Sequence, residues 1–343
     1  MKYSSKDLID FASNDYLGFS KNKIVSEEIL GNEPVFKEVE QFIAQFHQTE
    51  SALIFNSVKE ANLAFFCTIP QKDDLILFDE LCQVSIQDAI LFSNAKSHSF
   101  EHNNFEDLEK LLLNQKPKNQ EPTTIFIITE SVFSMDGDTP NLEELIQLSQ
   151  QYHCNLVIDE SNSLGVFGSK GEGLIQMLGL QDFCFARIMT FENALGCECG
   201  AIICTNDLKK HLGNFDARSI STREIFPMSA AAILIAYNHL ESEKQTIERL
   251  RENIIHFNQE LNLLGLKPLF VRSKSAIQSA IISGNQNIKR IANQFQEIGF
   301  DVKPIFSPEV PEGQERLQFC LHSYNSKEEI SEVLCLLSAF VFS

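Results

Sequence analysis

The chain has 343 residues, of which 43% are apolar, and it carries 47 acidic against 28 basic side chains for a formal net charge of −19. Such a chain can bury a large core, and its charge repels nucleic-acid phosphates and anionic membranes over most of the surface. No apolar run approaches the length of a membrane span, and the first residues lack the apolar segment of a secretion signal, so we expect a cytoplasmic protein with neither partner.

Short apolar or β-branched runs alternate with helical patterns through the first two thirds of the chain. The runs predicted to be buried strands are Ala52–Phe55, Leu75–Phe78, Thr124–Thr129, Asn155–Ile158, Ile188–Thr190 and Ala201–Cys204. One helix is predicted from about Val35 to Phe46, and another begins at Asn141, whose side chain can cap the turn that contains Glu144. This alternation indicates an α/β fold with a mostly parallel sheet flanked by helices.

The last third has a different pattern. A long helix is predicted from Met228 to about Leu263 and bridges two domains. It is followed by strands near Ser279–Ile282 and Arg316–Leu321 and helices near Asn287–Ile298 and Ser326–Leu337. We therefore predict an N-terminal arm (1–34), a large α/β domain (35–228), and a bridging helix with a small C-terminal α+β domain (229–343).

Polar residues follow several of the predicted strands, where ligands bind in an open parallel sheet. Asp159 ends one strand, and its carboxylate can hold a protonated heteroaromatic nitrogen or cap the next turn. The polar segment Glu130–Asp138 follows another strand. Thr190 ends a third, where its hydroxyl can meet a phosphate or begin a turn.

The nine cysteines indicate reduced thiols used as small core residues, because most lie in apolar runs and their number is odd. Cys197 and Cys199, with Cys204 nearby, are not completed by a CxxC pair or a histidine pair. We therefore expect no metal site.

Four motifs carry a resemblance to a known family: Asn14–Gly18, Glu130–Asp138, Asp159–Glu160 with Gly165, and Pro311–Gly313 followed by Arg316–Leu317. In order and separation they resemble those of the α-oxoamine synthases, most of all the 8-amino-7-oxononanoate synthases. These are fold-type-I pyridoxal-phosphate enzymes that condense an amino acid with an acyl thioester and release carbon dioxide. The resemblance spans nearly the whole chain and implies an aminotransferase-like fold.

The resemblance also implies a role for individual residues of a cofactor pocket at a dimer interface. It places Asp159 at the cofactor ring nitrogen, Ser134 near the phenolic oxygen, Thr190 at the phosphate, Thr222 across the interface, and Asn14 and Arg316 at the substrate, with Arg316 receiving its carboxylate.

One position departs decisively from the family pattern. The cofactor lysine belongs in a turn that here runs from Thr190 to Gly196, and Asn193 stands in its place. An amide nitrogen cannot form a Schiff base, because its lone pair is delocalised, and it cannot move the Cα proton. We therefore predict that covalent binding of pyridoxal phosphate is absent, and we assign no catalytic residue.

Other cofactor contacts implied by the resemblance are also changed. Gln83 replaces the histidine that stacks on the ring, which its flat amide covers only weakly, and Asn162 replaces a second imidazole. Ser57-Val58-Lys59 replaces a Ser-Gly-aromatic turn at a helix N-terminus, where glycine lets backbone amides approach the phosphate, and Val58 should crowd that approach.

Lys59 introduces a cation beside the predicted phosphate cup, where it can compensate for lost amide contacts. We expect it to form an ion pair with Glu192, next to the Thr190 turn, and to fill the cup. The segment 19–34 is also shorter than the glycine- and serine-rich arm of the family, which puts acyl-thioester binding in doubt.

Three hypotheses remain open from the sequence. The first is a non-catalytic subunit that keeps the dimeric scaffold, as a homodimer or paired with a lysine-bearing relative, by analogy with serine palmitoyltransferase. The second is an active transferase that holds pyridoxal or pyridoxamine phosphate without a covalent bond. The third is a scaffold whose polar residues are remnants of the fold.

Overall fold

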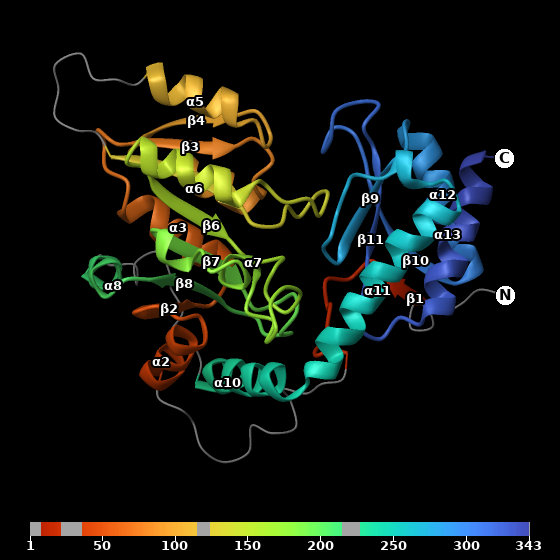
Figure 1. Cartoon of the computed structure of the whole chain (residues 1–343), viewed down its shortest axis with the longest axis horizontal. Coiled ribbons are helices and arrows are strands. Elements are labelled where there is room, and N and C mark those ends of the chain that lie inside the picture. Colours follow the sequence, from red (N-terminus) through yellow and green to blue (C-terminus); the bar gives the residue numbers. More distant parts are fainter. Residues whose placement is uncertain (1–7, 22–35, 115–123, 215–226, 343) are drawn as a thin grey trace.

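The computed structural model describes residues 8–21, 36–114, 124–214 and 227–342. Its larger sheet has seven strands in the order β2-β8-β7-β6-β5-β3-β4 (Figure 1). The strands from β7 to β4 are parallel, whereas β8 is antiparallel to both of its neighbours. Their bounds are β2 Ser51–Phe55, β3 Leu75–Asp79, β4 Lys96–Phe100, β5 Ile125–Glu130, β6 Asn155–Asp159, β7 Ala186–Thr190 and β8 Gly200–Cys204.

Helices cover both faces of this sheet. They are α2 Phe36–Phe46, α3 Val58–Thr68, α4 Val84–Leu91, α5 Phe105–Asn114, α6 Leu142–Gln151, α7 Leu174–Met177 and α8 Asn206–Asn214. Successive strand residues point to opposite faces, so Ile128 joins the core beneath α3 and α4 while Ile127 joins the core beneath α5 and α6. Burial on both faces explains the nearly continuous apolar runs of these strands and confirms the predicted α/β class with a mostly parallel sheet flanked by helices.

A second, four-stranded sheet has the order β1-β10-β11-β9 and packs against helices near the C-terminus (Figure 1). Its elements are β1 Ile9–Phe11, β9 Ile277–Ile281, β10 Phe300–Ile305, β11 Arg316–Cys320, α11 Lys244–Leu263, α12 Asn285–Ile298 and α13 Lys327–Phe342. β1 pairs in parallel with β10, so part of the predicted N-terminal arm is an edge strand of this sheet. The exact domain boundaries stay a prediction.

The predicted bridging helix is two helices. A single residue, Glu243, separates α10 (Pro227–Ser242) from α11. Its backbone leaves helical geometry, with φ −94° and ψ 47°. α10 lies beside the larger sheet, and α11 runs from its end to the second sheet (Figure 1). None of the helices described is long and apolar enough to cross a membrane.

Candidate functional site

The predicted site lies at the carboxyl ends of four neighbouring strands of the larger sheet. Asp79, Glu130, Asp159 and Thr190 are the last residues of β3, β5, β6 and β7, and the parallel pairing brings these ends to one edge. This edge faces the second sheet (Figure 1). The fold therefore gathers polar side chains from distant parts of the chain where open α/β sheets bind ligands.

Asp159 and Glu130 form a buried pair of carboxyl groups in direct register on adjacent strands. Oδ1 of Asp159 accepts a hydrogen bond from the amide of Ser161 at 2.8 Å, whereas the buried Oδ2 has no hydrogen-bond partner among the described residues. Burial raises the pKa of Asp159 to about 6, and burial together with the Asp159 charge holds the pKa of Glu130 well above its usual range. Oδ2 of Asp159 is thus a desolvated acceptor that a ligand donor would satisfy.

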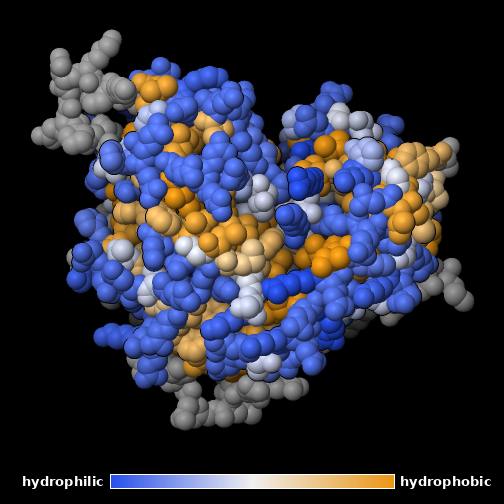
Figure 2. All heavy atoms as spheres, viewed as in Figure 1, coloured by the Kyte–Doolittle hydropathy of each residue, from blue (hydrophilic) through white to orange (hydrophobic). Residues whose placement is uncertain are grey.

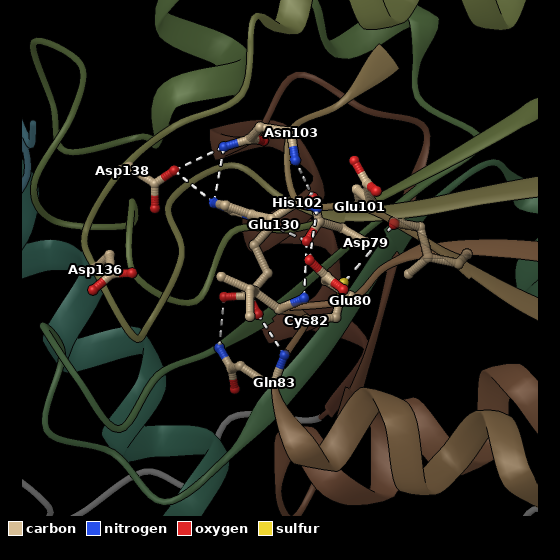
Figure 3. Close-up of polar contacts among 12 residues, drawn as sticks. Asp79, Glu80, Cys82, Gln83, Glu101, His102, Asn103, Glu130, Asp136 and Asp138 are labelled. Carbon is tan, nitrogen blue, oxygen red and sulfur yellow. Dashed lines mark hydrogen bonds and ion pairs between the residues drawn. The ribbon is translucent and has the colours of Figure 1, made fainter. Parts of the chain in front are cut away.

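Glu130 is held by the start of α4 and by the loop after β5 (Figure 3). The backbone amide of Gln83 donates to Glu130 Oε1 at 2.6 Å, and the Gln83 side-chain Nε2 donates to Oε2 at 3.3 Å. The amide of Ser134 also donates to Oε2 at 3.3 Å. The Gln83 side chain is therefore directed at Glu130. That its amide would cover a cofactor ring only weakly stays a prediction.

The Asn193 side chain is bonded to the loop that follows β6. Its Nδ2 donates to the carbonyl oxygen of Ser161 and to Oδ1 of Asn162, both at 3.0 Å. The Tyr16 hydroxyl donates to the same Asn162 oxygen at 3.2 Å, and Asn162 in turn donates to the Val132 carbonyl. The amide at the predicted lysine position is thus a structural hydrogen-bond donor that fastens two loops together.

Thr190 already uses its hydroxyl within the protein. Its Oγ1 donates to the carbonyl of Cys199 at 3.3 Å and accepts from the amide of Glu192 at 3.2 Å, while its own amide donates to Ser161 Oγ. A phosphate bound here would have to displace the Cys199 contact to receive the Thr190 proton.

The start of α3 lies close to the end of β7. The hydroxyl of Ser57 caps the helix by accepting from the amide of Glu60 at 3.2 Å, and the amides of Val58 and Lys59 have no intrahelical acceptor. Gly200 runs directly beside this turn, because a Cβ on it would lie 2.6 Å from the Val58 nitrogen. Amides at the start of a helix can hold an anion, so the amides of this turn could hold a phosphate despite the valine.

The expected ion pair between Lys59 and Glu192 is not formed. Both side chains are exposed, and neither takes part in any ion pair between described residues. Two solvated charges gain little free energy by pairing. That gain does not offset the entropy lost when both side chains are held in one geometry.

Arg316, which the sequence predicts at a substrate carboxylate, is bonded to other residues of the chain. Its Nε and Nη2 donate to the two oxygens of Asp136 at 2.6 and 2.9 Å, and its Nη1 donates to the carbonyl of Gln314. Both partners of this ion pair are more than nine-tenths buried. A substrate carboxylate would have to displace an internal one that is already bound in bidentate geometry.

A cavity of about 100 Å³ between the second sheet and the loops of the larger one is lined by a lysine that the sequence analysis did not single out. Lys303 lines it together with Asn14, Ser134, Asn162 and Gln318, and it is the only lysine among the described residues that do so. Lys303 lies on β10 directly opposite Gln318 on β11. No strand was predicted at β10, so nothing in the sequence placed this amine near the site.

His102 links the larger sheet to the loop that carries the Glu130–Asp138 motif (Figure 3). Its Nδ1 lies 2.9 Å from Asp79 Oδ1, and its Nε2 lies 2.9 Å from Asp138 Oδ2, which also accepts from Asn103 Nδ2 at 2.7 Å. Burial disfavours the charge, but hydrogen bonds and attraction from Asp138 and Asp79 outweigh it and raise the pKa of His102 to about 10. The imidazolium therefore clamps this loop in place.

This clamp makes stability depend on pH in the alkaline range. The folded protein holds the His102 proton up to about pH 10, whereas the unfolded chain releases it near 6.5. The contribution of the His102 proton to the free energy of unfolding is complete below pH 6.5. It is lost as pH rises toward 10, by at most about 1.4 kcal/mol per pH unit. Urea unfolding between pH 7 and 10 should show this decline, and it should be shallower in His102→Gln than in the control His256→Gln. Equal slopes in the two variants would contradict the clamp.

Thr222, the residue expected to cross a dimer interface, lies outside the described residues. Of the other predicted site residues, Ser134, Asp159, Asn162, Thr190 and Asn193 lie at the strand ends or in the loops that follow them. Ser57, Val58 and Lys59 approach them from the start of α3, and Gln83 from the start of α4.

Comparison with known proteins agrees with this architecture. Residues 6–335 match the family Aminotransferase class I and II. An 8-amino-7-oxononanoate synthase of Emericella nidulans is 33% identical over 361 residues, covering 95% of this chain and 87% of the relative. A putative 8-amino-7-oxononanoate synthase of Geobacillus kaustophilus is 32% identical over 346 residues, with the same coverage.

Solved structures show the same fold. The 8-amino-7-oxononanoate synthase of Francisella tularensis superposes with a TM-score of 0.82 at 29% identity, covering 98% of this chain and 99% of that one. The serine palmitoyltransferase of Sphingomonas wittichii superposes with a TM-score of 0.85 at 22% identity, covering 97% and 87%. The chain therefore belongs to the aminotransferase class I and II family and, within it, to the α-oxoamine synthases, as an 8-amino-7-oxononanoate synthase-like member.

Proposed function

We propose that this protein has lost the condensation reaction of its family because Asn193 stands where the cofactor lysine belongs. The observation that carries the proposal is the state of the Asn193 amide, whose Nδ2 is bonded to Ser161 and Asn162 and has no nucleophilic lone pair. The protein would then act as a non-catalytic subunit or scaffold with the family's fold. Neither a covalent anchor nor a base for the Cα proton is available at this position.

The proposal is tested with the wild-type protein and added pyridoxal phosphate. We expect no borohydride-fixed adduct on any peptide by mass spectrometry, and no release of thiol from an acyl thioester in the presence of an amino acid. The putative 8-amino-7-oxononanoate synthase of Geobacillus kaustophilus is run beside it in both assays for comparison. An adduct on Lys303 or Lys59 would overturn the proposal, because it would identify a replacement amine.

A second candidate function is a transferase that holds pyridoxal or pyridoxamine phosphate without a covalent bond. Oδ2 of Asp159 favours it, because this buried oxygen has no partner among the described residues and suits a protonated ring nitrogen. The amides of Val58 and Lys59 at the start of α3 suit the phosphate. The cofactor, when bound, supplies an electron-withdrawing ring, and these residues would orient it.

Calorimetry with pyridoxamine phosphate tests this second candidate. Asp159→Asn is expected to weaken binding at least about tenfold, since it removes a charge-assisted hydrogen bond of roughly 1.5–3 kcal/mol. Asp207→Asn, at a fully solvated carboxylate, should leave the affinity unchanged. Because the carboxylate form is the acceptor, wild-type affinity should also fall as pH drops below about 6. Absence of heat at millimolar ligand excludes the candidate.

We further propose that the protein is a homodimer, with a heterodimer containing a lysine-bearing relative as the alternative. Three large apolar side chains in and after α4 support a buried contact, because Val84, Leu91 and Phe92 are 71%, 80% and 69% exposed in the single chain. Sedimentation of the purified protein distinguishes a dimer from a monomer. Purification of a second chain of similar size with it would identify the heterodimer.

A further inference from the structure

A large cavity lies away from Asn193 and Asp159, neither of which lines it. It is a groove of about 970 Å³ between α11, the segment that follows it, and the loop that leads to α7. Figure 2 shows this region as a hollow between the two halves of the molecule, with apolar surface inside and hydrophilic side chains around it. Its volume lies within the range of small-molecule sites in proteins.

The walls of this groove combine apolar side chains with basic ones. Phe167, Met177, Ile254, Ile255, Phe270 and Val271 supply the apolar surface. Met177 is 46% and Ile255 is 58% exposed, so part of this surface meets water in the single chain. Leaving such side chains in contact with water costs free energy that an apolar ligand would recover.

The charged part of the lining is entirely basic. Arg251, Lys267, Arg272 and Lys274 line the groove, and no Asp or Glu does so among the described residues that form it. Because acidic residues outnumber basic ones by 47 to 28 in this chain, a lining without carboxylates creates a local field opposite to that of the whole protein.

Three of these cations are available to a ligand. Arg251 donates to the carbonyl of Gly168 and so belongs to the wall. Lys267, Arg272 and Lys274 are exposed, and none of them forms an ion pair with a described residue. Arg272 and Lys274 flank Ser273, which is buried while both cations are exposed.

We propose that this groove binds an anionic amphiphile, a medium- or long-chain acyl group with a carboxylate or phosphate head. The head lies between Arg272 and Lys274, and the chain lies along the apolar wall that includes Ile255. Ser273, between the two cations, donates to the carbonyl of Gly137 in the Glu130–Asp138 loop at 2.8 Å. The groove therefore adjoins the back of that loop, and its binding does not depend on a cofactor.

Calorimetry with dodecanoate and dodecyl phosphate below their micelle concentrations tests the proposal with the full-length protein. Both are expected to bind with one site per chain, more weakly at higher salt, and the tighter of the two identifies the preferred head. Dodecyltrimethylammonium, which has the same chain and a positive head, is expected not to bind. Equal binding of the cationic amphiphile would overturn the proposal, as would the absence of heat with both anions.

Matched variants separate the groove from the general charge of the protein. Arg272→Gln/Lys274→Gln is expected to weaken binding about tenfold, which corresponds to about 1.4 kcal/mol. Lys289→Gln/Arg290→Gln on α12 makes the same change of net charge outside the lining and should have no effect. Equal losses in both variants would show that only net charge matters.

A second matched pair of variants tests the apolar wall of the groove. Ile255→Gln should weaken binding, whereas Ile298→Gln, at an isoleucine that is 44% exposed on α12, should not. Circular dichroism of each variant checks that the fold is kept. Binding to anionic vesicles without binding to the monomeric amphiphile would overturn the proposal in favour of a membrane contact. Loss of self-association in Ile255→Gln, without binding of either amphiphile, would identify the groove as an interface between copies.

Discussion

Replacement of Asn193 by lysine is expected to give the protein a covalent bond to added pyridoxal phosphate that the wild type does not form. The lysine would stand in the turn after β7, beside the loop that follows Asp159, whose Oδ2 has no partner among the described residues. Borohydride reduction and peptide mapping should then find about one adduct per chain, on residue 193. The change from no adduct to a stoichiometric one is the largest effect that the proposed function predicts.

This substitution also removes two internal hydrogen bonds. Loss of the contacts from Asn193 to Ser161 and Asn162 should lower the free energy of unfolding by roughly 1–3 kcal/mol. Asn193→Met is the matched control, because it loses the same contacts and provides no amine. A folded Asn193→Lys protein without an adduct would show that the pocket is closed for another reason, such as the Val58 turn or the internally bonded Thr190 hydroxyl.

Replacement of Arg316 is expected to destabilise the protein strongly. Arg316→Met leaves the Asp136 carboxylate buried without its bidentate partner, which costs about 3–5 kcal/mol. Urea unfolding should show the loss as a lower midpoint with an unchanged slope. The same experiment on Lys327→Met, which breaks an exposed ion pair with Glu252, should show less than about 1 kcal/mol.

A double variant tests the cause of this loss. Arg316→Met/Asp136→Leu removes both charges and should recover much of the stability, because no unpaired charge remains buried. If Arg316→Met were as stable as the wild type, the ion pair would have no structural role.

The strands of the larger sheet could be predicted because their burial does not depend on distant detail. β5 and β6 are apolar on both faces, and their predicted spans match the structure within a few residues. β4 could not be predicted, because it is an edge strand with the polar sequence Lys96–Phe100 and mostly exposed side chains. The prediction of one long helix was wrong in one respect. Glu243 divides it into two helices, and no proline or glycine marks the break.

The candidate site could be predicted only in part. Residues that end the strands, such as Asp159 and Thr190, were located from the sequence because the carboxyl ends of a parallel sheet meet at one edge. The hydrogen-bond partners of the side chains around them could not be predicted from the sequence. The amide of Gln83 is directed at Glu130, and Lys303 approaches the cavity from the second sheet.

The sequence by itself determined the family and the alternation of strands and helices, and it predicts that Asn193 stands at the lysine position, because each depends on residue type and spacing along the chain. The tertiary structure alone decided that Arg316 is bound to Asp136, 180 residues away, and that cations converge on one groove of an acidic protein. Such contacts depend on how the second sheet and its helices pack against the loops of the larger sheet. That packing follows from the sum of many buried side chains and not from any local pattern.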